Sequence, residues 1–186
     1  MIESNASPSE LSSPFYEANK EFSLTFEKFI KENGGIAEGK YNAWSYSVVG
    51  KIDIAKEWVL KYKKSTLTSG NLLLSSKTQN LFVASVWKTH KIKGEEFIIR
   101  KKKFKDSFSK VLNSKFKGLE DYKKYTLISK NKSKSISDLI AILRPLLISG
   151  EAYQITNKEK ELVIELRTEK HNFDIFKKLN DSNIID

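Results

Sequence analysis

Basic side chains are the residues of this chain whose type and spacing suggest chemistry, and they gather in the middle of the sequence. Between Val83 and Lys134 there are sixteen Lys and Arg residues against five Asp and Glu residues, a balance of +11, whereas the whole chain carries +10. Such a band could face an anionic partner, either a nucleic acid or a membrane surface. We therefore predict an anion-binding patch. Its candidate members are Lys88, Lys91, Lys93, Arg100, Lys101, Lys102, Lys103, Lys123 and Lys124.

A second interpretation of the basic band stays open. Only Arg100, Arg144 and Arg167 are arginines, although the bidentate guanidinium is the group that specific phosphate and base recognition favours. A sequence rich in Lys, Asn and Ile is also typical of an AT-rich genome. The band is therefore either a functional surface or a solvated face.

Other chemistry finds little support in the residue types. The histidines are His90 and His171, which are far from metal-ligand spacing, and the chain has no cysteine to supply a thiolate or a disulfide. His90 could contact phosphate when protonated, and His171 is a weak candidate for a general base. No glycine-rich phosphate loop or nucleophile elbow occurs. We predict no catalytic residue, no metal site and no cofactor, so the expected protein is not an enzyme.

The composition predicts a soluble, cytoplasmic protein. Hydrophobic residues make up 39% of the 186, which is enough for a sizeable core. The first 13 residues lack the basic and apolar regions of a signal peptide, and no apolar run approaches the roughly 20 residues of a spanning helix. Association with the cytoplasmic face of a membrane stays compatible with the basic band.

The N-terminal part predicts a disordered segment over residues 1–13 and then an amphipathic helix. Ser13 can cap this helix and Pro14 suits its first position, and the helix should run from Phe15 to Asn33 with Gly34 as its stop. Its apolar stripe comprises Phe15, Ala18, Phe22, Phe26 and Phe29. We expect the stripe to pack on the protein's own sheet, and docking of a protein partner is the alternative. The oligomeric state cannot be predicted.

Period-two alternation then predicts strands. Residues 44–48 and 52–62 should form an antiparallel pair with one buried face, interrupted at Gly50. Residues 81–87 are apolar on both sides at first, so we place this strand centrally in the sheet. Residues 97–99 form a further apolar strand. Because the Arg100–Lys103 charges cannot be buried, this strand should reach an edge or the rim of the sheet by Arg100, forming one positive patch with Lys88, Lys91 and Lys93.

The remaining elements alternate between strands and helices. We expect short elements at 72–74 and 108–112, a basic loop at 113–124 and a strand at 125–129. Ser135 and Asp138 have capping-box spacing before a helix that Pro145 must kink and Gly150 ends. Its inner face comprises Leu139, Ile142, Leu143, Leu146 and Leu147.

The last elements are a hairpin, a helix and a tail. The hairpin should join 152–156 and 161–167 across Asn157–Lys158, with Leu162, Ile164 and Leu166 on its inner face. Phe173, Phe176 and Leu179 then mark a short helix, and residues 181–186 should be a frayed tail. The prediction is a single α+β domain over residues 14–180, with a mostly antiparallel sheet, the N-terminal amphipathic helix and two or three further helices on one face.

The order of elements resembles a bacterial family. The stretches GKIDIAKEWVLKY, LFVASVWKTHKIKGEEFIIRKKK, YTLISKN, LIAILRPLL, ELVIEL and HNFDIF are similar to the soluble domain of a domain-of-unknown-function family that usually follows one or two transmembrane helices. The resemblance covers roughly Tyr41 to Leu179. It implies no catalytic residues. The family's membrane helices are not matched, and the predicted helix from Phe15 to Asn33 stands in their place.

These observations favour a non-catalytic binding or scaffolding module, peripheral at the cytoplasmic membrane face. The first alternative is a nucleic-acid-binding protein that uses the central lysine-rich patch. The second is an enzyme whose site has no recognisable motif.

Overall fold

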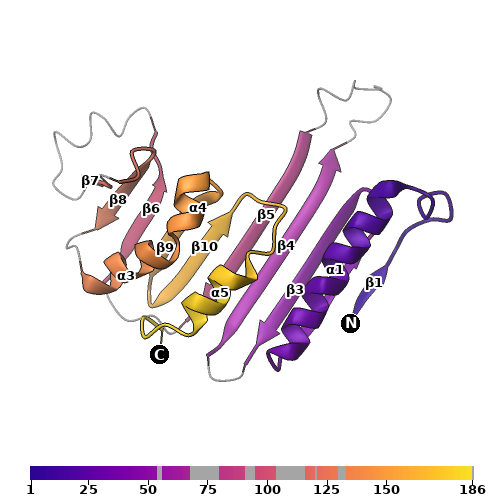
Figure 1. The fold of residues 1–186 in the computed structure, drawn as a ribbon, viewed down its shortest axis with the longest axis horizontal. Helices are drawn as coiled ribbons and strands as arrows, with labels where there is room; N and C mark the ends of the chain where they lie inside the picture. The colour runs from indigo at the N-terminus through magenta and orange to yellow at the C-terminus, as the bar shows by residue number, and fades with distance from the viewer. Residues whose placement is uncertain are drawn as a thin grey trace. The chain divides into compact units, whose positions relative to one another are not determined.

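The computed structural model describes residues 1–53, 56–67, 80–90, 95–103, 116–119, 121–129 and 133–185. The chain is α+β, with a mostly antiparallel sheet, an N-terminal helix and further helices, as the sequence predicted (Figure 1). It divides into two compact units, Met1–Val86 and Trp87–Asp186. The division falls inside strand β5 (Asn80–Thr89), which contributes to both units. The single domain over 14–180 stays a prediction.

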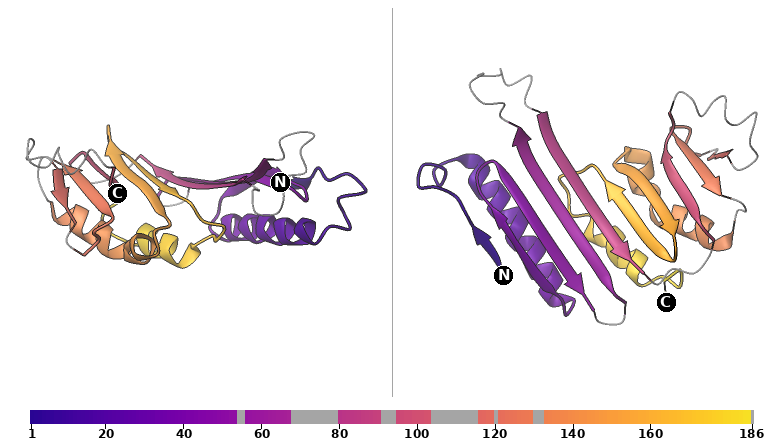
Figure 2. Two further views of the ribbon diagram at one scale, coloured as in Figure 1. Left: turned by 90° about the horizontal axis from the view of Figure 1, so that it is seen from above. Right: turned by 180° about the vertical axis from the view of Figure 1, so that it is seen from behind.

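The first unit is a sheet with one helix on one side. Its strand order is β1-β2-β3-β4-β5, where β1 pairs parallel with β2, and β2 with β3 and β3 with β4 pair antiparallel. The helix α1 (Pro14–Glu32) lies along one face of these strands (Figure 2, left). The strand bounds are Ile2–Ser4 for β1, Ile36–Tyr41 for β2, Ser45–Ile52 for β3 and Trp58–Leu67 for β4.

Helix α1 begins as predicted but turns a different stripe inward. The Ser13 side chain accepts a hydrogen bond from Phe15 N, Pro14 opens the helix, and the helix ends before Asn33. Phe15 and Ala18, which the predicted stripe included, are exposed. The buried residues are Tyr16, Asn19, Ser23, Phe26, Glu27, Phe29 and Ile30. The buried face of α1 is therefore rotated about the helix axis relative to the predicted apolar stripe, and it includes polar residues. The spacing of the apolar residues alone could not predict this rotation.

The polar residue Asn19 has a structural role on this inward face. It is 2% exposed, and its Nδ2 donates to the backbone oxygens of Asn42 at 2.9 Å and Ala43 at 3.1 Å. These oxygens belong to the turn between β2 and β3, where they would otherwise be buried without a donor. Asn19 therefore ties the helix to the turn.

The packing of α1 on its own sheet is confirmed by ring contacts. Phe22 stacks on Tyr46 with centroids 4.3 Å apart, and Phe26 meets Tyr62 edge to face at 5.2 Å. Gly50 does not interrupt the strand as predicted; it lies within β3. A Cβ at Gly50 would collide with the Ile30 side chain and come within 2.8 Å of Phe26 Cζ, so the residue is small because α1 crosses there.

The N-terminal segment differs from the predicted disorder. Residues 2–4 form β1, Ile2 is 5% exposed, and the Met1 amino group donates to Ala37 O at 2.7 Å. The predicted disorder rested on the Ser-rich, polar composition of residues 1–13. Pairing with the edge of β2 supplies the hydrogen bonds that the composition could not indicate.

The second unit is also a sheet with helices on one face (Figure 2, left). Its strand order is β10-β9-β6-β8-β7, and the residues Trp87–Thr89 at the end of β5 belong to the same unit. β6 pairs antiparallel with β8 on one side and β9 on the other. The strand bounds are Phe97–Lys101 for β6, Phe116–Gly118 for β7, Tyr125–Ser129 for β8, Ala152–Lys158 for β9 and Glu161–Leu166 for β10.

The helices of the second unit are α3 (Lys134–Ile142), α4 (Arg144–Ser149) and α5 (Phe173–Asn180). Pro145 divides α3 from α4, and Gly150 ends α4 with φ 78°, as predicted. The cap of α3 is Ser133, not Ser135, because the Ser133 hydroxyl accepts from Ile136 N at 3.4 Å. The core beneath these helices is apolar. Its members include Trp87, Ile99, Leu127, Leu139, Leu143, Ile155, Leu162, Ile164 and Phe176.

Several other expectations meet a definite outcome. The hairpin is present, but its turn lies at Glu159 and Lys160, which have φ of 54° and 63°, and not at residues 157–158. The basic loop at 113–124 contains the short strand β7. The predicted frayed tail is partly packed, because Ile184 and Ile185 are 5% and 2% exposed. The expected elements at 72–74 and 108–112 lie outside the described residues.

Within the described ranges, no helix has the length and apolar character that crossing a bilayer requires.

We predict that Phe26→Ala destabilises the protein by about 3–5 kcal/mol, because Phe26 is fully buried between α1 and the sheet. Phe15→Ala in the same helix is the matched control, since Phe15 is 59% exposed and its truncation should change stability by less than about 0.5 kcal/mol. Denaturant unfolding of both variants measures the difference. Equal effects would mean that the helix does not present this face to the sheet.

Candidate anion-binding surface

Six of the predicted patch residues lie together at one end of the second unit's sheet. They are Arg100, Lys101, Lys102, Lys103, Lys123 and Lys124, and we call them the basic cluster. Lys101 pairs in register with Tyr125, and Lys102 N donates to Lys124 O at 2.8 Å. The end of β6 and the turn before β8 therefore bring two separate basic runs side by side.

The termination of β6 explains how these charges stay in water. Phe97 and Ile99 point into the core, at 4% and 1% exposure, while Ile98 points to the other face. The sequence predicted that this strand reaches either an edge or the rim of the sheet by Arg100. β6 pairs with a strand on each side, so it is not an edge strand, and its end lies at the rim of the sheet. The strand ends at Lys101, and Lys101, Lys102 and Lys103 are exposed.

The cluster carries little compensating negative charge. Lys101, Lys102, Lys123 and Lys124 are exposed and have no carboxylate partner among the described residues. Arg100 is half-buried and donates from Nη1 to Lys101 O at 3.2 Å. These four lysines therefore present solvated ammonium groups beside one partly engaged guanidinium.

Lys88 does not belong to this cluster, which corrects the prediction of one patch. Its Nζ lies 2.6 Å from Glu161 Oε1, and His90 Nδ1 lies 3.3 Å from the same oxygen. Glu161 stands opposite Lys158, at the end of the sheet where Phe97 pairs with Asn157. That end is about 13 Å along β6 from Lys101, at about 3.3 Å per residue.

The physical reason is that the sequence cannot show strand direction across a connection. Lys88 lies at the end of β5, just before the connection to β6, and Arg100 lies near the far end of β6. Because β6 runs away from that connection, the two charges lie at opposite ends of the sheet. Glu161, sixty residues further on, neutralises Lys88. Lys91 and Lys93 lie outside the described residues.

Tyr125 anchors the turn that carries Lys123 and Lys124. Its side chain is 1% exposed, its hydroxyl donates to Ala152 O at 2.7 Å, and its amide donates to Tyr122 O at 2.8 Å. Burial raises the pKa of the Tyr125 hydroxyl above its usual value of 10.0. The turn that carries Lys123 and Lys124 is thus held by a buried, hydrogen-bonded side chain.

The two histidines have different surroundings. His171 stacks on Phe173 with centroids 4.5 Å apart, and His90 is exposed beside Glu161. Among the residues that the structure describes, no group of three or more His, Asp or Glu side chains is placed to hold a metal ion.

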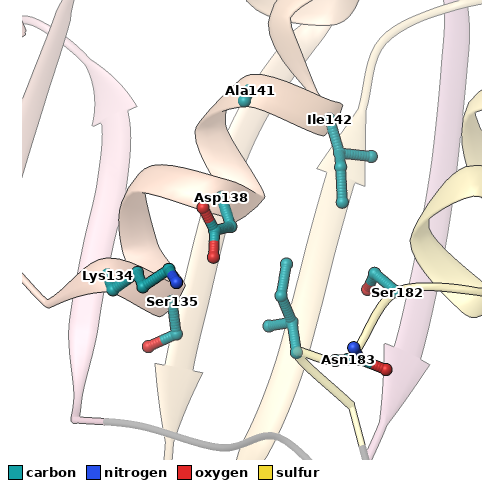
Figure 3. Close-up of a pocket in the computed structure, with 8 residues that line it drawn as sticks. Lys134, Ser135, Asp138, Ala141, Ile142, Ser182 and Asn183 are labelled. Atoms are coloured by element: carbon teal, nitrogen blue, oxygen red, sulfur yellow. The ribbon is translucent and has the colours of Figure 1, made fainter.

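A separate shallow groove of about 600 Å³ runs between α3 and the segment after α5. Figure 3 shows Lys134 and Asp138 on the α3 side, Ser182 and Asn183 on the other side, and Ile142 pointing between them. The two segments are about forty residues apart in the sequence, so no local pattern predicts this groove. Opposite charges at Lys134 and Asp138 give it no preference for anions.

A second group of lysines was missed by sequence reasoning. Lys40, Lys51, Lys61 and Lys63 are exposed on the face of the first unit's sheet that α1 does not cover, and we call this surface the lysine face. The signal was present as polar positions alternating with the apolar ones. These four lysines lie outside residues 83–134, where the charge excess of the sequence is concentrated.

Comparison with known proteins found no match to any family model, curated protein or solved structure. The resemblance to a domain family found behind transmembrane helices stays a prediction.

We predict that the Tyr125 hydroxyl makes stability fall at alkaline pH. Because its folded pKa is raised above the unfolded value of 10.0, the neutral form stabilises the fold below about pH 10, and this contribution is lost as the pH rises through the folded pKa. Tyr125→Phe should cost about 1 kcal/mol near neutral pH through the lost hydrogen bond. The difference between the two proteins should shrink above about pH 10, as denaturant unfolding across pH would show. If the difference in unfolding free energy between the two proteins stays constant across pH, the Tyr125 hydroxyl does not have a raised pKa in the folded protein.

Proposed function

We propose that this protein is a non-catalytic binding module that attaches peripherally to an anionic membrane surface, at its cytoplasmic face, through the basic cluster. The observation that carries the proposal is the convergence of residues 100–103 and 123–124 at one rim of a sheet. Such a cluster lowers its electrostatic free energy by approaching a negative surface.

The expected strength is sufficient for reversible attachment. Each Lys or Arg near an anionic leaflet contributes about 1 kcal/mol, and this contribution falls off within a Debye length. Six such residues could supply several kcal/mol at low salt. The attachment should therefore be salt-sensitive and reversible, as suits a binding or scaffolding role.

Two features favour a lipid surface over a nucleic acid. Five of the six cations are lysines, which act as point charges on flexible stems and do not demand a fixed geometry from the partner. The single guanidinium, Arg100, already donates to Lys101 O. The resemblance to domains that follow membrane helices also supports a position next to a bilayer. Nucleic-acid binding through the same cluster is the runner-up, and the same experiment tests it.

We predict that Lys101→Glu combined with Lys103→Glu lowers the affinity for vesicles of phosphatidylcholine and phosphatidylserine by at least about a hundredfold, because two charges change sign and the net charge near the surface falls by four units. The salt dependence of the remaining binding should flatten. Vesicle co-sedimentation over a range of salt concentrations measures both effects, with vesicles of phosphatidylcholine alone as the neutral reference.

The matched control is Lys158→Glu with Lys178→Glu, which makes the same charge change on exposed lysines of the same unit away from the cluster. This control should bind nearly as well as the wild type. If the wild type ignores anionic vesicles but shifts duplex DNA or RNA in a salt-dependent way, the nucleic-acid alternative replaces the proposal. If it binds none of them at low salt, the cluster is only a solvated face.

A further inference from the structure

The open face of the first unit's sheet has an ordered arrangement of side chains. The strand registers place Ile36, Lys51 and Val59 in one row across β2, β3 and β4. The next row contains Glu38, Val49 and Lys61, and the third contains Lys40, Ser47 and Lys63. Rows on one face repeat every two residues, so neighbouring rows are about 6.6 Å apart and neighbouring strands about 4.8 Å apart.

The positive charge lies on the β3 and β4 side of this arrangement. Lys51, Lys61 and Lys63 are exposed and have no carboxylate partner among the described residues. Within these three rows the acids stand on the other side: Glu38 is on β2, and Glu3 on β1 is in register with Lys40. Lysines on adjacent strands are therefore free to face an external anion, whereas Lys40 has a neighbouring acid.

The same face offers apolar groups between the lysines. Ile36 is 72% exposed, and Val49 and Val59 are half-buried. The aromatic side chains of these strands point the other way: Tyr46, Trp58 and Tyr62 are at most 2% exposed and lie on the α1 side. Aromatic stacking platforms are what single-stranded nucleic acids use, whereas aliphatic groups flanked by lysines suit a headgroup layer, into which lysine amines can snorkel.

From these observations we infer that the lysine face is a second docking surface for an anionic lipid bilayer. Lys51, Lys61 and Lys63 contact lipid phosphate and carboxylate groups, and Ile36 enters the headgroup region. The inference rests on the proposed function for the kind of partner, but it concerns different residues in the other unit. It therefore predicts binding that the basic cluster does not carry alone.

Lysine stems over valines also keep an open sheet face soluble, and that role alone would need no lipid. The two roles separate by charge. Lys→Gln keeps a polar side chain with two of the four methylene groups beside Val49 and Val59 and removes the positive charge, so a purely protective role would leave vesicle binding nearly unchanged.

The test uses Lys51→Gln, Lys61→Gln and Lys63→Gln together in the full chain. At about fivefold per lysine, binding to mixed phosphatidylcholine and phosphatidylserine vesicles should fall by at least about fiftyfold. The matched control is Lys28→Gln, Lys134→Gln and Lys178→Gln, three exposed lysines elsewhere, which should bind as the wild type does. Unfolding midpoints of both triple variants confirm that the fold is intact.

A second variant tests the same surface in the opposite direction. Glu3→Gln with Glu38→Gln removes the two acids on the β1 and β2 side of the open face and should strengthen vesicle binding by about tenfold. This gain cannot come from a folding defect, so the inference stays testable even if the lysine triple variant is unstable. Unchanged binding in this variant would overturn the inference.

The outcomes distinguish this inference from the proposed function. If the lysine triple variant loses vesicle binding and the Lys101→Glu and Lys103→Glu protein retains it, the lysine face is supported. The basic cluster is then excluded as a lipid-binding surface. The reverse pattern overturns the lysine face and leaves the proposed function standing. A triple variant that binds vesicles like the wild type but has lost duplex DNA or RNA binding also overturns the inference.

Discussion

The packing of α1 on β3 and β4 is the interaction on which the first unit depends. Phe26 is fully buried against Tyr62, and the absent side chain at Gly50 lets Ile30 approach the strand backbone. This contact decides which face of the sheet is dry. Because strand side chains alternate, it also decides that Lys51, Lys61 and Lys63 face water. The lysine face is thus a consequence of where the aromatic residues are buried.

The basic cluster follows from the same one-sided burial in the second unit. Helices cover the face that contains Phe97 and Ile99, and pairing with β9 reaches Arg100 opposite Gln154. Lys101 keeps only the β8 neighbour, and Lys102 and Lys103 follow outside the strand. Burying unpaired charges would be costly, so the sheet ends where the charge run begins. Tyr125 then fixes the neighbouring turn by its buried hydrogen bond.

Local signals explain how much of this could be predicted from the sequence. Ser13 and Pro14 predicted the start of α1, Pro145 predicted the break between α3 and α4, and the charge run predicted a strand end near Arg100. These features depend on a few neighbouring residues. The buried face of α1 could not be predicted because polar residues such as Asn19 and Ser23 occupy it, and Asn19 finds its hydrogen-bond partners in a turn some twenty residues away.

The division of the predicted patch has the same origin. Lys88 and Arg100 are close in sequence, but the direction of β6 separates them, and no local pattern reports that direction. The neutralising partner of Lys88 is Glu161, on a strand reached only after α3, α4 and β9. The membership of a surface charge cluster is therefore a property of tertiary pairing, whereas the solvation of each charge is local.

This distribution of acids bears on whether the lysines reflect composition or function. Codon usage would place lysines without regard to where the acids lie. At the Phe97 end of the second unit, Glu161 pairs with Lys88 and Glu159 with Lys158, whereas four of the cluster lysines, Lys101, Lys102, Lys123 and Lys124, have no carboxylate partner among the described residues. Compensation at one end and excess at the other produce a directional field that a uniform lysine bias does not explain, and such a field orients a protein on a charged surface.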